Sequence, residues 1–298
     1  MKPLLALMLA ATLCGGCAEG TDRDAPFVAE VRKADLGDTR IAWYERGAGP
    51  PLVMLIGTGS TMAEWDPALL RLLARDRRLL LLDYPGVGES GRWRGRSFGS
   101  LATNVADWME AIEVERADIL GWSMGGFVAQ RLAVMHPERV SKLILAGTNP
   151  GSPRTVLGPP SSQKIDSDPN PTDAEILREL YPPGRQTEGR RFLRRLVRAS
   201  QTGEIPDDFR VPAATTDAQV AAEDPWLRSR RNLRQLRSVA APTLAAAGRR
   251  DRVVPPPNLE LIADRIPEAE LEVFDGAHAF LFQERRRFTS AVDAFLGK

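Results

Sequence analysis

Short apolar runs that alternate with helical segments constrain the fold of this chain more than any other feature. Continuous apolar runs are typical of strands that are buried on both faces of a sheet. They lie at residues 52–56, 79–82, 117–120, 143–146, 243–247 and 271–274. Stretches with apolar residues at helical spacing lie at 62–75, 101–112, 125–136, 257–266 and 280–296. Because parallel strands need crossover connections, this order predicts an α/β fold with a mostly parallel, doubly wound sheet.

A hairpin is expected at one edge of this sheet. Residues 27–32 and 40–45 alternate apolar and polar side chains on either side of a turn at Gly37-Asp38. Such alternation is typical of an antiparallel strand that has one face in water. The hairpin and the buried runs together predict an eight-stranded sheet.

The alternation of predicted strands and helices stops between residues 149 and 240. This stretch is rich in proline and has helical patterns at 172–181, 189–200 and 217–236, but no convincing strand. It therefore predicts a helical cap, inserted into a core formed by residues 27–148 and 241–298.

Five arginines in the middle helical pattern surround an apolar stripe. Such a distribution is typical of a solvated helix face, and recognition of a substrate carboxylate or a lipid headgroup is the alternative. These residues are Arg190, Arg191, Arg194, Arg195 and Arg198.

The first 17 residues are typical of an export signal peptide. Lys2 precedes an apolar run over residues 4–13, and small residues follow, ending in Gly-Gly-Cys17. This ending resembles a bacterial lipoprotein signal, which implies that Cys17 is acylated and that the protein is anchored in the bacterial cell envelope. A plain signal peptide, leading to the periplasm or the medium, and a buried N-terminal helix are the alternatives. The small, polar residues 18–26 are typical of a flexible tether.

The near-neutral charge of the chain limits which binding partners are expected. The chain has 40 basic and 39 acidic side chains and a formal net charge of +1, which gives no reason to expect nucleic acid or an anionic membrane as partner. Membrane contact is therefore expected only through a lipid on Cys17. The sequence has neither metal-ligand clusters of His and Cys nor phosphate-binding glycine motifs, so it predicts no metal and no organic cofactor.

A candidate nucleophile, Ser123, lies in Gly121-Trp122-Ser123-Met124-Gly125, between the predicted strand at 117–120 and the predicted helix at 125–136. A nucleophilic serine needs a sharp strand-to-helix turn whose neighbours are small. The N–H groups at the start of the helix favour a developing oxyanion. A tight glycine turn with an incidental serine is the alternative, and the strand-turn-helix context argues against it.

A nucleophilic serine requires a base, and the chain has two histidines. The helix that follows Ser123 carries His136 to its far end, about 20 Å away, so we expect a structural role for His136. His278 follows the last predicted strand, in a loop at the carboxyl edge where doubly wound sheets place their sites. His278 is therefore the predicted base.

Asp251 is the predicted partner of the base. It leaves the preceding strand in a loop, where its carboxylate can orient the imidazole and stabilise the imidazolium. Arg250 and Arg252 flank it, so a loop ion pair is the alternative. Asp275 is a weaker candidate, because it precedes the turn that carries His278.

The order Ser123, Asp251, His278, with each residue at a strand end, resembles the α/β-hydrolase superfamily. The resemblance extends from about residue 41 to residue 295. Residues 83–90 are similar to the D-x-P-G-x-G-x-S loop of many members, with Val87 in place of a frequent histidine, and that loop is mainly structural in the family.

The resemblance also implies an oxyanion hole. Where many members carry His-Gly, this chain has Ile56-Gly57, but backbone donors need no particular side chain. The N–H groups of Thr58 and Met124 are therefore the implied donors, with Gly59 as an alternative to Thr58. Trp122 and Gly59 are the expected substrate contacts.

The implied reaction is acyl transfer through Ser123 to water, and thus carboxylesterase-like hydrolysis of a small-molecule ester. A serine nucleophile argues against the dehalogenase and epoxide-hydrolase branches, which use aspartate. The alternatives are a peptidase or amidase of the proline-aminopeptidase kind and a catalytically silent, ligand-binding lipoprotein. The peptidase would need acidic cap residues to hold a substrate amine. Acids available in the insertion are Glu175, Glu179, Glu188, Glu204, Asp207 and Asp208.

Overall fold

The computed structural model describes residues 27–166 and 172–297, and the predicted signal peptide, Cys17 and the tether lie outside these ranges. Eight strands form one sheet in the order β1-β2-β4-β3-β5-β6-β7-β8. The first two strands run antiparallel to their neighbours and the others are parallel. The strands are β1 (Arg32–Asp35), β2 (Arg40–Arg46), β3 (Pro51–Leu55), β4 (Arg78–Leu82), β5 (Ala117–Trp122), β6 (Val140–Ala146), β7 (Thr243–Gly248) and β8 (Ala269–Phe274).

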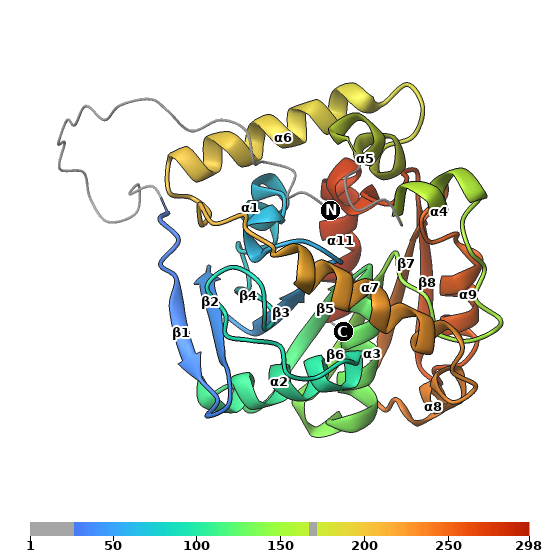
Figure 1. Ribbon diagram of the computed structural model, residues 1–298, viewed down its shortest axis with the longest axis horizontal. Coiled ribbons are helices and arrows are strands. Elements are labelled where there is room, and N and C mark those ends of the chain that lie inside the picture. Colours follow the sequence, from blue (N-terminus) through green and yellow to red (C-terminus); the bar gives the residue numbers. More distant parts are fainter. Residues whose placement is uncertain (1–26, 167–171, 298) are drawn as a thin grey trace, which may run out of the picture.

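Helices cover both faces of this sheet (Figure 1). On one face α2 packs on α3, and on the other α1 packs on α11. The helices that follow core strands are α1 (Pro67–Leu73), α2 (Phe98–Ala111), α3 (Met124–Met135), α9 (Pro257–Ala263), α10 (Phe280–Gln283) and α11 (Arg285–Leu296). The predicted α/β fold with a mostly parallel, eight-stranded sheet is confirmed.

Strand β5 lies in the middle of the sheet, between β3 and β6. All six of its residues are buried, because the sheet continues on both edges and helices pack on both faces. The turn that ends β5 therefore follows a fully enclosed strand of the core.

The N-terminal edge strand differs from its prediction at 27–32. β1 begins at Arg32 and pairs with β2 next to the turn, where Leu36 N–H donates to the Thr39 carbonyl (2.9 Å). The preceding segment bonds elsewhere, since Ala29 N–H donates to the Gly203 carbonyl at the end of an inserted helix (2.8 Å). The alternation of residues 27–32 therefore reflects contact with the insertion, and the strand forms later.

The predicted helix at 62–75 is interrupted. A short 3₁₀ helix covers Met62–Glu64, and α1 starts at Pro67 behind the N-cap Asp66, whose carboxylate accepts the Ala68 N–H (2.9 Å). Proline disfavours helical backbone in the residue before it and suits the first helical position. Pro67 therefore divides the predicted helix in two.

Helices and loops alone occur between β6 and β7 in the described residues. We call residues 149–240 the insertion. In Figure 1 its helices α5 and α6 lie above the carboxyl ends of the strands, and α7 crosses in front. The inserted helices are α4 (Pro160–Asp166), α5 (Asp173–Leu180), α6 (Gln186–Gln201), α7 (Ala213–Leu227) and α8 (Asn232–Gln235).

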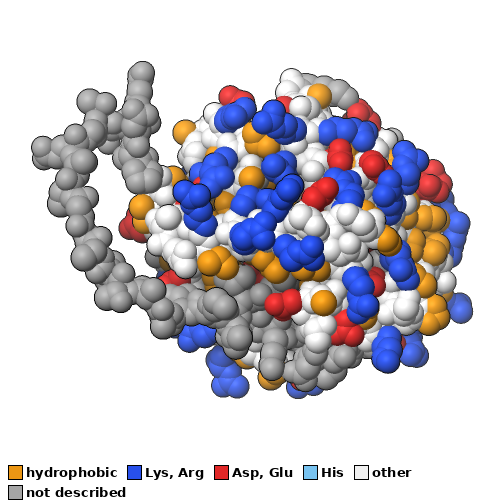
Figure 2. All heavy atoms as spheres, turned by 90° about the horizontal axis from the view of Figure 1, so that it is seen from above, with side chains coloured by type: hydrophobic (Ala, Val, Ile, Leu, Met, Phe, Trp, Pro, Cys, Tyr) orange, Lys and Arg blue, Asp and Glu red, His pale blue; other side chains and the backbone are white. Residues whose placement is uncertain are grey.

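Helix α6 is strongly amphipathic. Phe192 and Leu196 are buried against the core, while four of its arginines (190, 191, 194 and 198) are exposed. Figure 2, seen from above, shows Lys and Arg side chains gathered over this face. Arg195 departs from the expected solvated face, because its guanidinium forms two hydrogen bonds to Asp66 (2.9 and 2.5 Å). The Asp66 side chain is fully buried, so this ion pair ties the insertion to the cap of α1.

Candidate active site

Ser123 lies alone between the end of β5 and the start of α3. Its backbone has φ 57° and ψ −125°, and Glu113 is the only other non-glycine residue with positive φ in the described part of the chain. Such backbone is strained and persists only where its surroundings hold it. Ser123 N–H donates to the Ala146 carbonyl and Gly126 N–H donates to the Ser123 carbonyl (both 2.9 Å). The turn is thereby locked to β6 and to α3.

The glycines around Ser123 are required by close packing. A Cβ on Gly121 would collide with the carbonyl oxygen of Gly125, and a Cβ on Gly125 would collide with that of Leu55. Both obstacles are backbone atoms, which cannot rotate away. Glycine at these positions lets β3, β5 and α3 approach closely enough to present the serine at the turn.

Ser123, His278 and Asp251 form a continuous hydrogen-bonded chain. His278 Nε2 lies 3.0 Å from Ser123 Oγ, and His278 Nδ1 lies 2.8 Å from Asp251 Oδ2. The carboxylate can only accept, so the Nδ1–H donates to it and Nε2 is left to accept the serine hydroxyl proton. The structure thus brings the three predicted residues together from three strand ends.

Asp251 is held rigidly by the loop that follows β7. Its second oxygen, Oδ1, accepts the N–H groups of Val253 (2.9 Å) and Val254 (2.8 Å). The side chain is fully buried, and that of His278 is 5% exposed. With every bond in place, the carboxylate fixes both the tautomer and the ring plane of His278.

The other residues considered for the roles of acid and base, and the arginines beside Asp251, have different partners in the structure. Arg250 pairs with Asp275 at the surface (3.0 Å), and Arg252 donates to Ser161 (2.7 Å). The predicted alternative of an ion pair at Asp251 is therefore wrong. His136 follows α3 as its C-cap residue, and its Nε2 lies 3.3 Å from Thr103 Oγ1.

Trp122 both lines the candidate site and supports His278. Its indole Nε1 donates to the His278 carbonyl (3.0 Å), and its ring lies 5.3 Å from the imidazole at 35°. Met124 is the first residue of α3, so its N–H points out of the helix start, where an oxyanion is favoured.

Gly59 does not fit its predicted roles. Its N–H donates to Gln219 Oε1 from the insertion (2.8 Å), so this amide is not available as an oxyanion donor. Gly59 is also absent from the walls of the cavity described below, whereas Gly57 and Thr58 line it. Thr58 therefore stays the candidate for the first donor.

A cavity of about 340 Å³ opens beside Ser123 and His278. The core and the insertion both line it, and most of the side chains are apolar or aromatic. Those on the insertion are Leu157, Ile165, Ile176, Leu180, Phe192, Val220, Trp226 and Leu227, and those on the core are Trp122, Phe127, Val253, Val254 and Phe282. Such a lining suits a small organic molecule.

Among residues 27–166 and 172–297, three glutamates also line this cavity, and neither lysine nor arginine does. Glu64 comes from the 3₁₀ helix before α1, Glu179 from α5 and Glu223 from α7. Burial raises the pKa of Glu64 to about 7. Sequence reasoning considered Glu179 without placing it, and missed Glu64 and Glu223. The spacing Thr61-x-x-Glu64 is a capping-box signal, but it indicates only a helix start.

The loop at residues 83–90 is hydrogen-bonded to the segment that follows β3 and to strand β2. Asp83 Oδ1 accepts the Met62 N–H (2.7 Å), and Ser90 bridges to β2 by accepting the Ala42 N–H (2.8 Å). Complete burial raises the pKa of Asp83 to about 8. Val87, which stands where many relatives of this motif have histidine, is fully buried.

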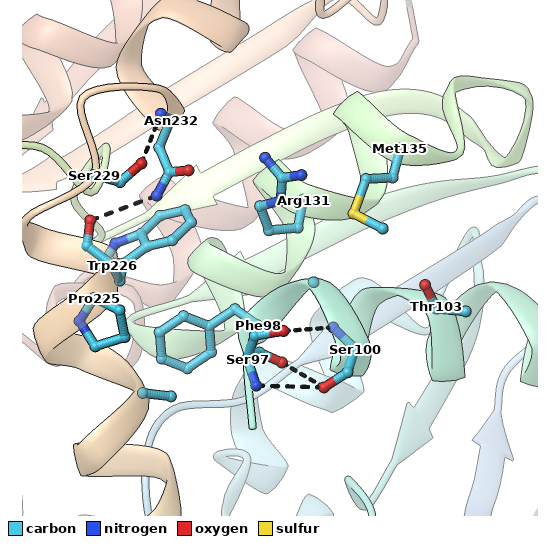
Figure 3. Close-up of a pocket in the computed structure, with 12 residues that line it drawn as sticks. Ser97, Phe98, Ser100, Thr103, Arg131, Met135, Pro225, Trp226, Ser229 and Asn232 are labelled. Atoms are coloured by element: carbon cyan, nitrogen blue, oxygen red, sulfur yellow. Dashed lines mark hydrogen bonds between the residues drawn. The ribbon is translucent and has the colours of Figure 1, made fainter. Parts of the chain in front are cut away.

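A second hollow of about 530 Å³ lies between α2, α3 and α7 (Figure 3). It contains Ser97 of another G-x-S-x-G at residues 95–99. Ser97 is the N-cap of α2, where its hydroxyl accepts the Ser100 N–H (3.2 Å), and no histidine is among the residues that line this hollow. The cavity at Ser123 is therefore the candidate active site, although Trp226 borders both hollows.

The family model for the alpha/beta hydrolase fold matches residues 50–285 of this chain. The chain is an α/β-hydrolase. The matched span includes Ser123, Asp251 and His278, and the relatives of this chain include proteins named as hydrolases and esterases.

Several relatives of this α/β-hydrolase match most of its length. It is 28% identical over 269 residues to a 2-hydroxymuconate semialdehyde hydrolase of Pseudomonas sp. (strain CF600), covering 86% of this chain and 89% of that protein. It is 30% identical over 259 residues to a pimeloyl-[acyl-carrier protein] methyl ester esterase of Aeromonas hydrophila subsp. hydrophila, covering 84% and 97%. An α/β-hydrolase fold protein from Chitinophaga pinensis superposes with a TM-score of 0.78 at 23% identity, covering 90% and 97%.

Two further observations concern metals and membranes. Over residues 27–166 and 172–297, no group of three or more His, Cys, Asp or Glu side chains is placed to hold a metal ion. In the same ranges no helix combines the length and the apolar character that a membrane crossing needs.

Proposed function

We propose that this α/β-hydrolase cleaves a small-molecule ester through a Ser123 acyl-enzyme. The observation that carries the proposal is the hydrogen-bonded chain from Ser123 through His278 to Asp251, set at a strained turn that faces the cavity. A strained nucleophile, a base within hydrogen-bond reach and a buried carboxylate behind it are the parts that acyl transfer needs.

The first half of the reaction forms the acyl-enzyme. Ser123 Oγ attacks the ester carbonyl carbon while His278 Nε2 takes the hydroxyl proton, and Asp251 stabilises the resulting imidazolium. The N–H groups of Thr58 and Met124 hold the oxyanion of the tetrahedral intermediate. The bond to the alkoxy group then breaks, and His278 returns the proton to the departing alcohol.

The second half reverses these roles with water. His278 removes a proton from a water molecule, whose oxygen attacks the acyl carbon. The bond to Ser123 Oγ breaks, the serine regains its proton from His278, and the free acid leaves. No cofactor takes part in either half.

An ester, rather than another acyl compound, is favoured by one relative. The esterase of Aeromonas hydrophila cleaves a methyl ester, as its name states, and matches 84% of this chain. The apolar walls of the cavity support an acyl chain or alcohol of modest size.

Hydrolysis of 4-nitrophenyl esters tests the proposal. We expect the purified protein to release 4-nitrophenol from short acyl esters faster than it cleaves the matching 4-nitroanilides. Faster cleavage of the anilides would favour the peptidase or amidase alternative. A folded protein that cleaves neither would favour the ligand-binding alternative.

We also propose that the protein is exported and held at the bacterial cell envelope by a lipid on Cys17. The support is the sequence of residues 1–17, with its apolar run and terminal Gly-Gly-Cys. Metabolic labelling with radioactive palmitate in a bacterial host should label the wild type and leave Cys17→Ser unlabelled. Equal labelling of both proteins would contradict the anchor.

A further inference from the structure

The candidate active-site cavity has an acidic lining, although the chain as a whole is nearly neutral. Its 40 basic side chains slightly outnumber its 39 acidic ones, yet the part of the cavity lining that the structure describes has three glutamates and neither lysine nor arginine. Among the described residues of the lining, His278 is the only side chain that can carry a positive charge, and the proposed reaction uses it as the base. The described lining is therefore predominantly acidic.

Glu179 distinguishes this arrangement from an ordinary acidic cluster. The residue is 6% exposed, and its Oε2 is buried without a hydrogen-bond partner in the described structure. A buried carboxylate oxygen that lacks a donor is costly. Since Glu179 lines the cavity, a ligand there can reach its carboxylate, and a rotation of the side chain would bring the unpartnered oxygen to the ligand's donor.

The other two glutamates differ from Glu179. Glu64 Oε2 accepts the Thr61 N–H (2.8 Å), and Glu223 Oε1 accepts the Thr58 hydroxyl (3.2 Å). Both therefore take part in holding the walls of the site. They add to the acidic character of the cavity, and Glu179 is the carboxylate whose acceptor capacity remains unused.

Aromatic rings complement the carboxylates. Trp122, Phe127, Phe192, Trp226 and Phe282 line the same cavity. The face of an aromatic ring attracts a cation, most strongly when the cation is desolvated. Carboxylates and ring faces in one buried cavity suit the same chemical group, a protonated amine attached to an apolar body.

We propose that the cavity selects esters that carry a cationic amine, and that Glu179 receives the ammonium group. This proposal rests on the proposed ester hydrolysis and names its substrate class. Glu179 acts here as a specificity residue, since Ser123 and His278 carry the reaction. An ammonium N–H donates to the Glu179 carboxylate while the rest of the substrate lies against the rings.

Pairs of esters that differ only in charge test this proposal. For the acyl side, 4-nitrophenyl 6-aminohexanoate is compared with 4-nitrophenyl heptanoate, where a methyl group replaces the ammonium. For the alcohol side, 2-(dimethylamino)ethyl butanoate is compared with 3-methylbutyl butanoate. We expect wild type to prefer the cationic member of at least one pair by about tenfold in kcat/KM.

The variant Glu179→Gln removes the charge with little change in shape. We expect the ratio of cationic to neutral kcat/KM to fall about tenfold, because the amide cannot neutralise an ammonium. The matched control is Glu175→Gln, an identical exchange on the same helix at a position outside the cavity lining. Glutamine also satisfies the capping box at position 175, so this control should keep the wild-type ratio.

The outcomes separate the two proposals. Neutral esters cleaved as fast as their cationic partners in both pairs, or a wild-type ratio in Glu179→Gln, would overturn the amine proposal alone. A folded protein that cleaves none of the four esters would overturn the proposed hydrolysis itself. Thermal unfolding of each variant establishes that the ratios belong to folded protein.

Discussion

The carboxyl edge of the sheet and the insertion line one cavity, and they differ in how their polar groups are hydrogen-bonded. At the sheet edge, Asp251 accepts from His278, Val253 and Val254. On the insertion, Glu179 keeps a buried oxygen without a partner in the described ranges. A fully hydrogen-bonded network has one geometry. A buried polar group without a partner, in contrast, is stabilised when a ligand forms a hydrogen bond with it. We infer that the sheet edge fixes the reaction and the insertion chooses the substrate.

The insertion itself has two faces of opposite charge. Its outer surface on α6 carries exposed arginines (Figure 2), while its inner wall contributes Glu179 and Glu223 to the cavity. Exposed charges are screened and tolerate substitution. Buried carboxylates are screened much less, so we expect substitutions on the inner wall to have the larger effects.

The largest expected effect is at the nucleophile. Ser123→Ala should lower kcat for a 4-nitrophenyl ester by roughly 10⁴–10⁶-fold, because the acyl-enzyme cannot form. Steady-state kinetics on purified protein measures this. Ser97→Ala, in the other G-x-S-x-G, is the matched control and should keep its kcat while losing about 1 kcal/mol of stability from the N-cap of α2. Comparable losses of activity in both variants would contradict the assignment.

The second effect concerns the acid. Asp251→Asn should lower kcat by about 10⁴-fold, since an amide NH₂ facing Nδ1 favours the wrong imidazole tautomer. The control is Asp275→Asn, which removes a carboxylate from the exposed ion pair with Arg250 and should stay within a factor of about two of wild type. Activity retained by Asp251→Asn would contradict the proposed role of Asp251.

The third effect tests how the insertion is attached. Arg195→Ala leaves the fully buried Asp66 carboxylate without its guanidinium partner, which should lower the free energy of unfolding by about 2–4 kcal/mol. Urea denaturation measures it. Arg194→Ala, on the exposed side of the same helix, should change stability by less than about 0.5 kcal/mol. Equal stability of the two variants would show that the ion pair does not hold α6 to the core.

The smallest effect is a pH dependence of folding stability, which we assign to Asp83 in the loop at residues 83–90. Asp83 has a pKa raised to about 8 by burial, so the folded state keeps a proton that the unfolded state loses near pH 4. The contribution of this group to stability is therefore present at low pH, falls as the pH rises from about 4 to about 8, and levels off above that. Between pH 6 and 9 we expect a loss on the order of 2 kcal/mol.

Asp83→Asn provides the comparison for this pH dependence. The amide oxygen can still accept the Met62 N–H, and it carries no titrating proton. Urea denaturation at several pH values should therefore give a flatter profile for the variant than for wild type. Parallel profiles would assign the pH dependence to other groups.

Much of the candidate active site could be predicted from the sequence, because the ends of the buried strands can be recognised in it. Ser123, Asp251 and His278 each follow a buried apolar run, and parallel strands bring their carboxyl ends to one edge. The G-x-S-x-G pattern was insufficient alone, since residues 95–99 match it too. The strand before Ser123 and the helix after it make the difference.

The cavity walls could not be predicted in the same way. Glu179 and Gly59 owe their surroundings to contacts between the insertion and the core, such as the bond from the Gly59 amide to Gln219. Arg195 looks like its neighbours in sequence, and only its pairing with Asp66 sets it apart. Contacts between residues far apart in the chain depend on packing, which periodicity does not encode.

Covalent labelling tests most directly whether Ser123 is an activated nucleophile. The purified protein is treated with a fluorophosphonate, and the adduct is located by mass spectrometry in wild type, Ser123→Ala and His278→Ala. We predict a single adduct on Ser123, absent from Ser123→Ala and strongly reduced in His278→Ala, because the base activates the hydroxyl. A folded wild-type protein that remains unlabelled, or an adduct on another serine, would contradict the account.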